Sequence, residues 1–261
     1  MTSRPRFPAR LAARQVAIKD VAGGRPAATA TALFDSRKEA DVRAAQDSPA
    51  MRARLVQKLA EQGVRSAAVL EAMGTVERHR FVDSALGAQA YEDTSLPIGL
   101  GQTISKPGVV ARMVELLLGA EGVQDGRLGR VLEIGTGCGY QAAVLACVAR
   151  EVYSMERLRG LHEKARENLR PFRLANVHLL FGDGMAGYAK GAPYAGIIAA
   201  AGGEALPDAW TAQLAVGGRL IAPMATGDGR QALVMVERQR QGFAHSILED
   251  VRFVPLKSGI A

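Results

Sequence analysis

The stretch VLEIGTGCGYQAA, residues 131–143, decides the fold class of this chain. A short apolar run, typical of a buried strand, passes through Gly135, Gly137 and Gly139 into a run typical of a helix. Glycine permits positive φ and leaves room where the backbone must approach a ligand closely. In an open α/β sheet, ligands bind beyond the carboxyl ends of the strands, and this turn lies at such an end. A tight turn that binds no ligand would need the same glycines. The surrounding sequence must therefore decide between a ligand-binding turn and a merely tight one.

Downstream of the turn, apolar runs alternate with amphipathic runs. This alternation predicts strands joined by covering helices, and strands that are apolar on both faces indicate a parallel sheet. The final part, residues 231–256, is predicted to form strands joined by a turn at Gly242, which adds an antiparallel strand at the edge. The expected strands are residues 130–135, 151–156, 177–183, 194–201 and 217–225, and the expected helices are residues 140–149, 158–172 and 206–214. The predicted class is therefore α/β, a mostly parallel sheet with helices on both faces.

Upstream of the turn, the sequence predicts an N-terminal helical addition. A Ser-Pro pair starts a helix over residues 48–64, and Ser66 is expected to cap a second helix that ends near residue 76. A third, strongly apolar helix is expected over residues 108–120. Glycine and proline break the pattern over residues 78–107, where we expect an extended, largely irregular surface segment.

The ligand class follows from the residues around the glycines. A dinucleotide fingerprint would have its third glycine where this chain has Tyr140, and Glu133 would place a carboxylate near a bound phosphate. Glu156 ends the second strand, where a carboxylate can accept both hydroxyls of a ribose. Asp183, followed by Gly184, ends the third strand and can accept from an adenine amino group. Each acid alone is typical of a solvated strand end, but the three together favour S-adenosylmethionine over a dinucleotide.

Most of the net charge of +7 comes from the first thirty of the 261 residues, where six Arg and Lys residues are accompanied by one acid, Asp20. This tail, rich in Ala and Pro, cannot offset the entropy lost on ordering. We predict a disordered basic tail over residues 1–47 and a single domain over residues 48–261. Within this domain, residues 48–129 are expected to form the helical, substrate-side segment and residues 130–261 the cofactor-binding core.

The cellular setting is expected from the same composition. Cys138 and Cys147 suit neither a disulfide framework nor a metal site, so a reducing compartment is expected. No apolar run approaches the ~20 residues of a membrane helix. We therefore expect a cytoplasmic monomer without a metal ion or membrane contact. Nucleic acid is disfavoured as a partner because the excess charge lies in the tail.

Several motifs together make the chain resemble one family. The successive motifs of protein-L-isoaspartate O-methyltransferases are similar to VLEIGTGCGYQAAVLA, VYSMER, FGDG, APYAGIIAAA and VRFVPL, and that family's substrate-side segment is similar to RHRFV and AYEDTSLPIGLGQTISKP. The resemblance covers residues 51–261. It implies a Rossmann-like class I methyltransferase fold. It also implies methyl transfer from S-adenosylmethionine to the α-carboxyl of L-isoaspartyl residues in damaged proteins and peptides, which initiates repair through a succinimide.

The resemblance also implies roles for individual residues. Ser105 would be the active-site residue, and Thr103 would help to line the substrate site. The cofactor would be bound by Gly135, Gly137 and Gly139, by Glu156 at its ribose and by Asp183 near its adenine. The chain departs from the family pattern at Ala195, where the family often has Asp, and at the Lys257–Ser258 ending.

This chemistry accounts for the sparse equipment of the segment GQTISKP, residues 101–107, which contains no acid, histidine or cysteine. A carboxylate titrates near 4, so it is already an ionised nucleophile at neutral pH and needs no general base. Hydroxyl groups such as those of Ser105 and Thr103 can orient it. Ser105 could instead cap the following helix. Lys106 is expected to face solvent, where it could attract an acidic substrate. The alternative function is methylation of a small-molecule carboxyl or hydroxyl group.

Overall fold

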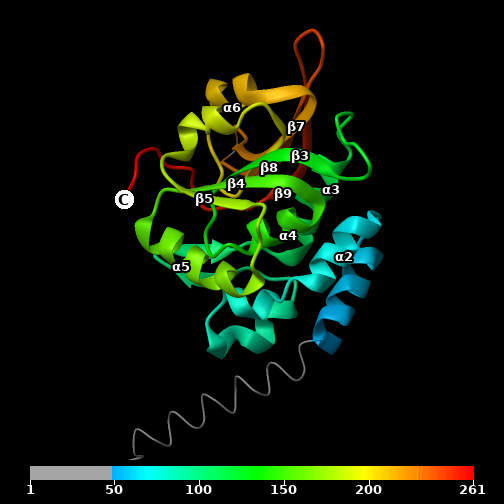
Figure 1. The fold of residues 1–261 in the computed structure, drawn as a ribbon, viewed down its shortest axis with the longest axis vertical. Helices are drawn as coiled ribbons and strands as arrows, with labels where there is room; N and C mark the ends of the chain where they lie inside the picture. The colour runs from blue at the N-terminus through cyan, green and yellow to red at the C-terminus, as the bar shows by residue number, and fades with distance from the viewer. Residues whose placement is uncertain (1–48, 228) are drawn as a thin grey trace, which may run out of the picture.

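The computed structural model describes residues 49–227 and 229–261, so the tail predicted over residues 1–47 lies outside the described residues. A seven-stranded sheet crosses the middle of the molecule, with helices on both sides (Figure 1). Its strands are β3 (Leu128–Ile134), β4 (Ala149–Glu156), β5 (Val177–Phe181), β6 (Tyr194–Ala199), β7 (Leu214–Ala225), β8 (Gln231–Arg238) and β9 (Phe243–Val251). Their order across the sheet is β5-β4-β3-β6-β7-β8-β9.

The sheet is parallel from β5 through β7 and antiparallel beyond it. β3 lies between β4 and β6, with Val131 opposite Val152 on one side and Gly196 on the other. The strand order reverses direction at β3, which makes its carboxyl end the switch point where ligands bind in open α/β sheets. The predicted antiparallel addition is confirmed. β8 pairs antiparallel with β7, and β9, at the edge of the sheet, pairs antiparallel with β8.

Both faces of the sheet are covered by helices. Neighbouring residues of each buried strand point to opposite sides, so each strand contributes to two hydrophobic cores. Val131 belongs to the core beneath the larger helices, whereas Leu132 belongs to the core packed by Trp210. Trp210 is almost fully buried. Figure 1 shows α4 and α5 on one side of the sheet and α6 on the other. The covering helices are α3 (Pro107–Leu118), α4 (Tyr140–Val148), α5 (Arg159–Leu169) and α6 (Asp208–Gln213).

The N-terminal addition packs against the core through helices, as predicted. A helix over residues 49–61 is followed by α2 (Ala67–Thr75), which contacts α4 and α3. The Ser66 hydroxyl accepts a hydrogen bond from the Val69 N–H, so the expected N-cap of α2 is confirmed. Among the described residues, no helix combines the length and the apolar character that a bilayer span requires.

The prediction for residues 78–107 was wrong in two respects, since the segment is neither irregular nor confined to the surface. It contains two 3-10 helices and a β-hairpin, and it buries Phe81 and Tyr91. Its apolar residues lack a helical or alternating period because they fill the gap between the helices and the sheet end, so the pattern gave no signal. The elements are η1 (Arg78–Phe81), η2 (Ser84–Tyr91), β1 (Leu96–Gly99) and β2 (Gln102–Ile104).

Candidate active site

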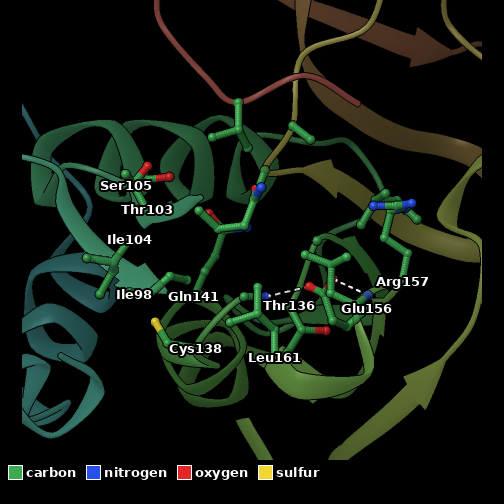
Figure 2. A pocket seen from close by; sticks show the side chains of 18 of the residues that line it. Ile98, Thr103, Ile104, Ser105, Thr136, Cys138, Gln141, Glu156, Arg157 and Leu161 are labelled. Atoms are coloured by element: carbon green, nitrogen blue, oxygen red, sulfur yellow. Dashed lines mark hydrogen bonds between the residues drawn. The ribbon is translucent and has the colours of Figure 1, made fainter. Parts of the chain in front are cut away.

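A cavity of about 230 Å³ lies at the carboxyl ends of β3, β4 and β6, roofed by the β1–β2 hairpin. Figure 2 shows Thr103 and Ser105 on one side of it and Glu156 and Arg157 on the other. Of the residues proposed from the sequence, six line this cavity: Thr103, Ser105, Gly135, Gly137, Glu156 and Gly184. Three do not line it: Glu133, Gly139 and Asp183. The fold thus brings segments that are far apart in sequence to one site.

The glycine turn has the conformation that its composition predicts. Gly135, Gly137 and Gly139 have φ values of 91°, 57° and 93°. A Cβ atom on Gly137 would lie 3.2 Å from the Ile98 side chain of the hairpin, and one on Gly139 would lie 3.0 Å from Leu169. The first two glycines therefore keep the cavity open, whereas Gly139 begins α4 against α5.

Glu156 occupies the end of β4, where it faces the cavity and fixes the turn. Its two carboxylate oxygens accept hydrogen bonds from the Gly137 N–H and the Leu158 N–H, both at 2.9 Å. Each oxygen has further lone pairs that can accept from a ligand hydroxyl. The residue is 5% exposed, so its carboxylate is fixed by these two hydrogen bonds and lies largely away from water.

Glu133 lies beneath the turn and is fully buried. One of its carboxyl oxygens accepts a short hydrogen bond from the Ser154 hydroxyl, which is 2.6 Å from the Thr136 hydroxyl. Burial raises the pKa of Glu133 to about 8, while Ser154 and the neighbouring Gln141 amide act in the opposite direction. At neutral pH this group is therefore largely a neutral acid, held in a polar chain that supports Thr136 in the cavity wall.

Gln141 was not singled out from the sequence, although it is a polar residue in an otherwise apolar helix. Its side chain lines the cavity and is 7% exposed. Its amide is near enough to Glu133 to lower the pKa of that group, but neither the nitrogen nor the oxygen has a partner in hydrogen-bonding geometry among the described residues. Because a buried polar group without a partner is costly, this amide is suited to a polar ligand in the cavity.

Ser105 and Thr103 present their hydroxyls on the hairpin side of the cavity. The Ser105 carbonyl accepts a hydrogen bond of 2.8 Å from Arg78, whose guanidinium is fully buried and lies 4.7 Å from the centre of the Tyr140 ring. The hydroxyl of Ser105 is not needed as a helix cap. Asp93 takes that role, since its carboxylate accepts from the Gly108 N–H in the first turn of α3 at 2.7 Å.

Asp183 lies beside the cavity and is bonded to the C-terminal segment. Its carboxylate accepts from the Met185 N–H at 2.9 Å and from the Gly259 N–H at 2.6 Å. Gly184 approaches β3 so closely that a Cβ atom would lie 2.5 Å from Ile134, and its carbonyl accepts a hydrogen bond from the Trp210 indole. The polypeptide that follows β5 therefore packs closely against the end of β3, and the C-terminal segment is bonded to it through Gly259.

The C-terminal segment was also missed as part of the site. Leu256 and Lys257 line the cavity, and residues further on are bonded to the chain that follows β4. The Ala261 N–H donates to the Arg157 carbonyl at 2.9 Å, and the Arg157 side chain donates to the Gly259 carbonyl at 2.8 Å. By contrast, Ala195 lies on β6 beside Gly129, near the start of the strand and outside the cavity lining.

These features fit S-adenosylmethionine. The open glycine turn, the rigid carboxylate at the end of β4 and the unpaired amide of Gln141 offer close backbone approach, a hydroxyl acceptor and a polar contact. A parallel sheet with this turn at its switch point, joined to a hydroxyl-bearing hairpin, defines the class: the protein is a class I S-adenosylmethionine-dependent methyltransferase.

Comparison with known proteins names the family. The model of the protein-L-isoaspartate(D-aspartate) O-methyltransferase family matches residues 50–261. The protein-L-isoaspartate O-methyltransferase of Methylibium petroleiphilum is 59% identical over 215 residues, which cover 82% of this chain and 79% of the relative. That of Ralstonia nicotianae is 54% identical over 260 residues, covering 94% and 80%. The chain belongs to the protein-L-isoaspartate(D-aspartate) O-methyltransferase family, so the small-molecule alternative is not favoured.

Solved structures agree with this fold. A protein-L-isoaspartate O-methyltransferase that is 29% identical has a TM-score of 0.71, covering 80% of this chain and 67% of the other. A Plasmodium falciparum protein provisionally assigned the same activity, in complex with S-adenosyl-L-homocysteine, has a TM-score of 0.67 at 23% identity. The two structures match over 79% of this chain and 98% of the Plasmodium falciparum chain.

Proposed function

We propose that Ser105 and Thr103 hold the α-carboxylate of an L-isoaspartyl residue for methylation, while the glycine turn and Glu156 hold S-adenosylmethionine. The observation that carries this assignment is the single cavity in which both sets of residues meet. The sequence separates Ser105 from Gly135 by thirty residues, yet both line the same space.

The cofactor-side roles follow from the contacts. Glu156 is suited to accept from ribose hydroxyls, and Gln141 offers an unpaired amide to another polar group of the cofactor. Gly135 and Gly137 leave room for it, while Glu133 supports the cavity wall from beneath. Asp183, with Gly184, remains the proposed adenine contact, although Gly259 already donates to one of its oxygens.

The substrate-side roles require little acid–base chemistry. When bound, S-adenosylmethionine supplies a methyl group activated by the sulfonium charge. The substrate carboxylate is ionised and loses no proton in the reaction, so the chain needs no general base. Hydroxyl groups of Ser105 and Thr103 can donate to one carboxylate oxygen and leave the other free to face the cavity. Such positioning can supply ~7–11 kcal/mol of a barrier.

Arg78 supports this arrangement from behind. Its hydrogen bond to the Ser105 carbonyl fixes the backbone of the loop without using the hydroxyl. The Asp93 contact fixes the start of α3 in the same way. The hydroxyl of Ser105 is therefore available while the residue that carries it is anchored on both sides.

The test uses radiolabelled S-adenosylmethionine and two peptides that differ only in carrying L-isoaspartate or L-aspartate. We expect label in the isoaspartyl peptide alone, as a base-labile ester. Ser105→Ala is expected to lower kcat/KM roughly 100-fold, because misplacement of a reacting group by about 1 Å can cost that much. Ser84→Ala, at an exposed serine away from the cavity, is the matched control. Equal labelling of the two peptides, or full activity of Ser105→Ala, would contradict the assignment.

We also propose that residues 48–129 form the substrate side, and residues 130–261 the cofactor side, of one domain. We further propose that the protein is a cytoplasmic monomer and that nucleic acid is not its partner. One hydrophobic core includes residues from both parts, such as Met73 and Val152, which favours a single unit. Cys138 and Cys147 form no disulfide with the described residues, and reducing compartments keep thiols in this state. Gel filtration with light scattering tests the monomer.

A further inference from the structure

A second hollow adjoins the active-site cavity on its substrate side. It shares four lining residues with that cavity: Thr103, Ser105, Ala200 and Val254. Its far wall consists of residues 229–231, at the start of β8, and residues 250–254, at the end of β9. We call this hollow the flank groove. It begins at the proposed methyl-accepting point and leads away from the glycine turn.

The flank groove carries an excess of positive charge. Among the described residues that line it, Lys106, Arg230 and Arg252 are basic and Asp250 is the one acid. Arg230 lies 2.9 Å from Asp250, so that pair is largely neutral. Lys106 and Arg252 are both exposed and form no salt bridge with the described residues. The excess charge of the groove therefore comes from Lys106 on the hairpin side and Arg252 on the sheet side.

We propose that the flank groove binds the polypeptide on one side of the isoaspartate, and that Lys106 and Arg252 make the enzyme prefer substrates with acidic flanking residues. This inference rests on the proposed function, because it assumes that the isoaspartyl carboxylate lies at Ser105. The continuity of the groove with Ser105 and Thr103 selects the occupant. A substrate residue in the cavity must have neighbours along its chain, and this groove is an exit for them.

The expected size of the preference follows from exposure. Attraction between exposed opposite charges is weak and is reduced by salt, because the Debye length falls from about 30 Å at 0.01 M to about 8 Å at 0.15 M ionic strength. Two such contacts predict a preference of roughly three- to tenfold in kcat/KM at low salt. The preference should appear mainly in KM, since the cations lie beside the chain and not at the reacting carboxylate.

The experiment compares three isoaspartyl peptides of equal length whose flanking residues are acidic, neutral or basic. Each is assayed at low and at near-physiological ionic strength with the native protein, with Lys106→Glu/Arg252→Glu, and with a control double variant. The control, Arg54→Glu/Arg240→Glu, makes the same change in net charge at two exposed positions outside the groove. It separates an effect of the groove from an effect of overall charge.

We expect the native protein to favour the acidic peptide over the basic one at low salt and to lose most of this preference at the higher salt. The groove variant should abolish or reverse the preference, and the control should keep it. Equal kcat/KM for the three peptides, or a preference that survives in the groove variant, would overturn the inference while leaving the proposed function intact. Failure to methylate even the neutral peptide would overturn both.

Discussion

The two walls of the cavity are built on different principles. On the glycine-turn side, Glu156 is paired with backbone N–H groups and Thr136 is bonded to Ser154, so these two side chains are held by the protein itself. On the hairpin side, the backbone of Ser105 is anchored by Arg78, but its hydroxyl and that of Thr103 face the cavity. A rigid wall suits a cofactor that never varies, and an anchored wall with free hydroxyls suits substrates that differ in sequence.

The difference also concerns burial. The supporting acid Glu133 is fully buried and the glycine turn is buried or half-buried, whereas Thr103 and Lys106 are exposed. Substitutions on the turn side should therefore alter stability and cofactor affinity together. Substitutions on the hairpin side should alter turnover with little effect on either. The following predictions test this separation, beginning with the largest expected effect.

The first prediction concerns the buried acid Glu133 on the glycine-turn side and the pH dependence of stability that it causes. Its usual pKa is 4.5, and in the native state it is raised to about 8, so the native protein keeps a proton that the unfolded chain releases. The free energy of unfolding should therefore fall as pH rises through this window, by up to about 1.4 kcal/mol per pH unit. Glu133→Gln removes this contribution. Urea unfolding between about pH 5 and about pH 8 should show that the free energy of unfolding of the variant increases relative to that of the native protein as pH rises. Parallel curves would contradict the assignment of a neutral Glu133.

Glu156→Ala tests the role of the glycine-turn side in cofactor binding. This change removes two hydrogen bonds to backbone N–H groups as well as the proposed acceptor for ribose hydroxyls. Since a hydrogen bond to a charged group contributes ~1.5–3 kcal/mol, the Kd for S-adenosylhomocysteine should rise roughly 100-fold. Calorimetric titration measures it. Glu151→Ala, at the opposite end of β4 where Glu151 pairs with His178, is the control and should bind normally.

Gly135→Ala separates backbone strain from cavity space. Gly135 has φ of 91° and lines the cavity, whereas Gly242 has φ of 83° in the β8–β9 turn with open space around it. Alanine at either position should cost about 1–2 kcal/mol of stability, because both require a left-handed backbone. Only Gly135→Ala should also weaken cofactor binding, by roughly tenfold. Equal cofactor affinity in both variants would show that the turn does not approach the cofactor.

Much of the cofactor wall was predictable because it depends on local patterns. The strand VLEI, the glycine spacing and the acid at the end of β4 follow one another closely in sequence, and each has its own periodicity or backbone requirement. The buried state of Glu133 was not predictable, because the residues that enclose it, such as Ser154 and Gln141, approach through tertiary packing.

The substrate wall could be predicted only through family resemblance. The hydroxyls of GQTISKP were identified, but the hairpin that presents them and the buried Arg78 behind them have no periodic signal. The C-terminal residues were missed for a similar reason. Lys257 reaches the cavity through contacts of the chain end with Arg157 and Asp183, which are far away in sequence.

The separation of the two walls is tested most directly by titrating S-adenosylhomocysteine into Ser105→Ala protein. If Ser105 acts on the substrate alone, the Kd should stay within about twofold of the native value, a change well under 1 kcal/mol, although kcat/KM for the isoaspartyl peptide falls roughly 100-fold. If the Kd rises about tenfold or more, Ser105 belongs to the cofactor site and the division of the cavity into two walls is wrong.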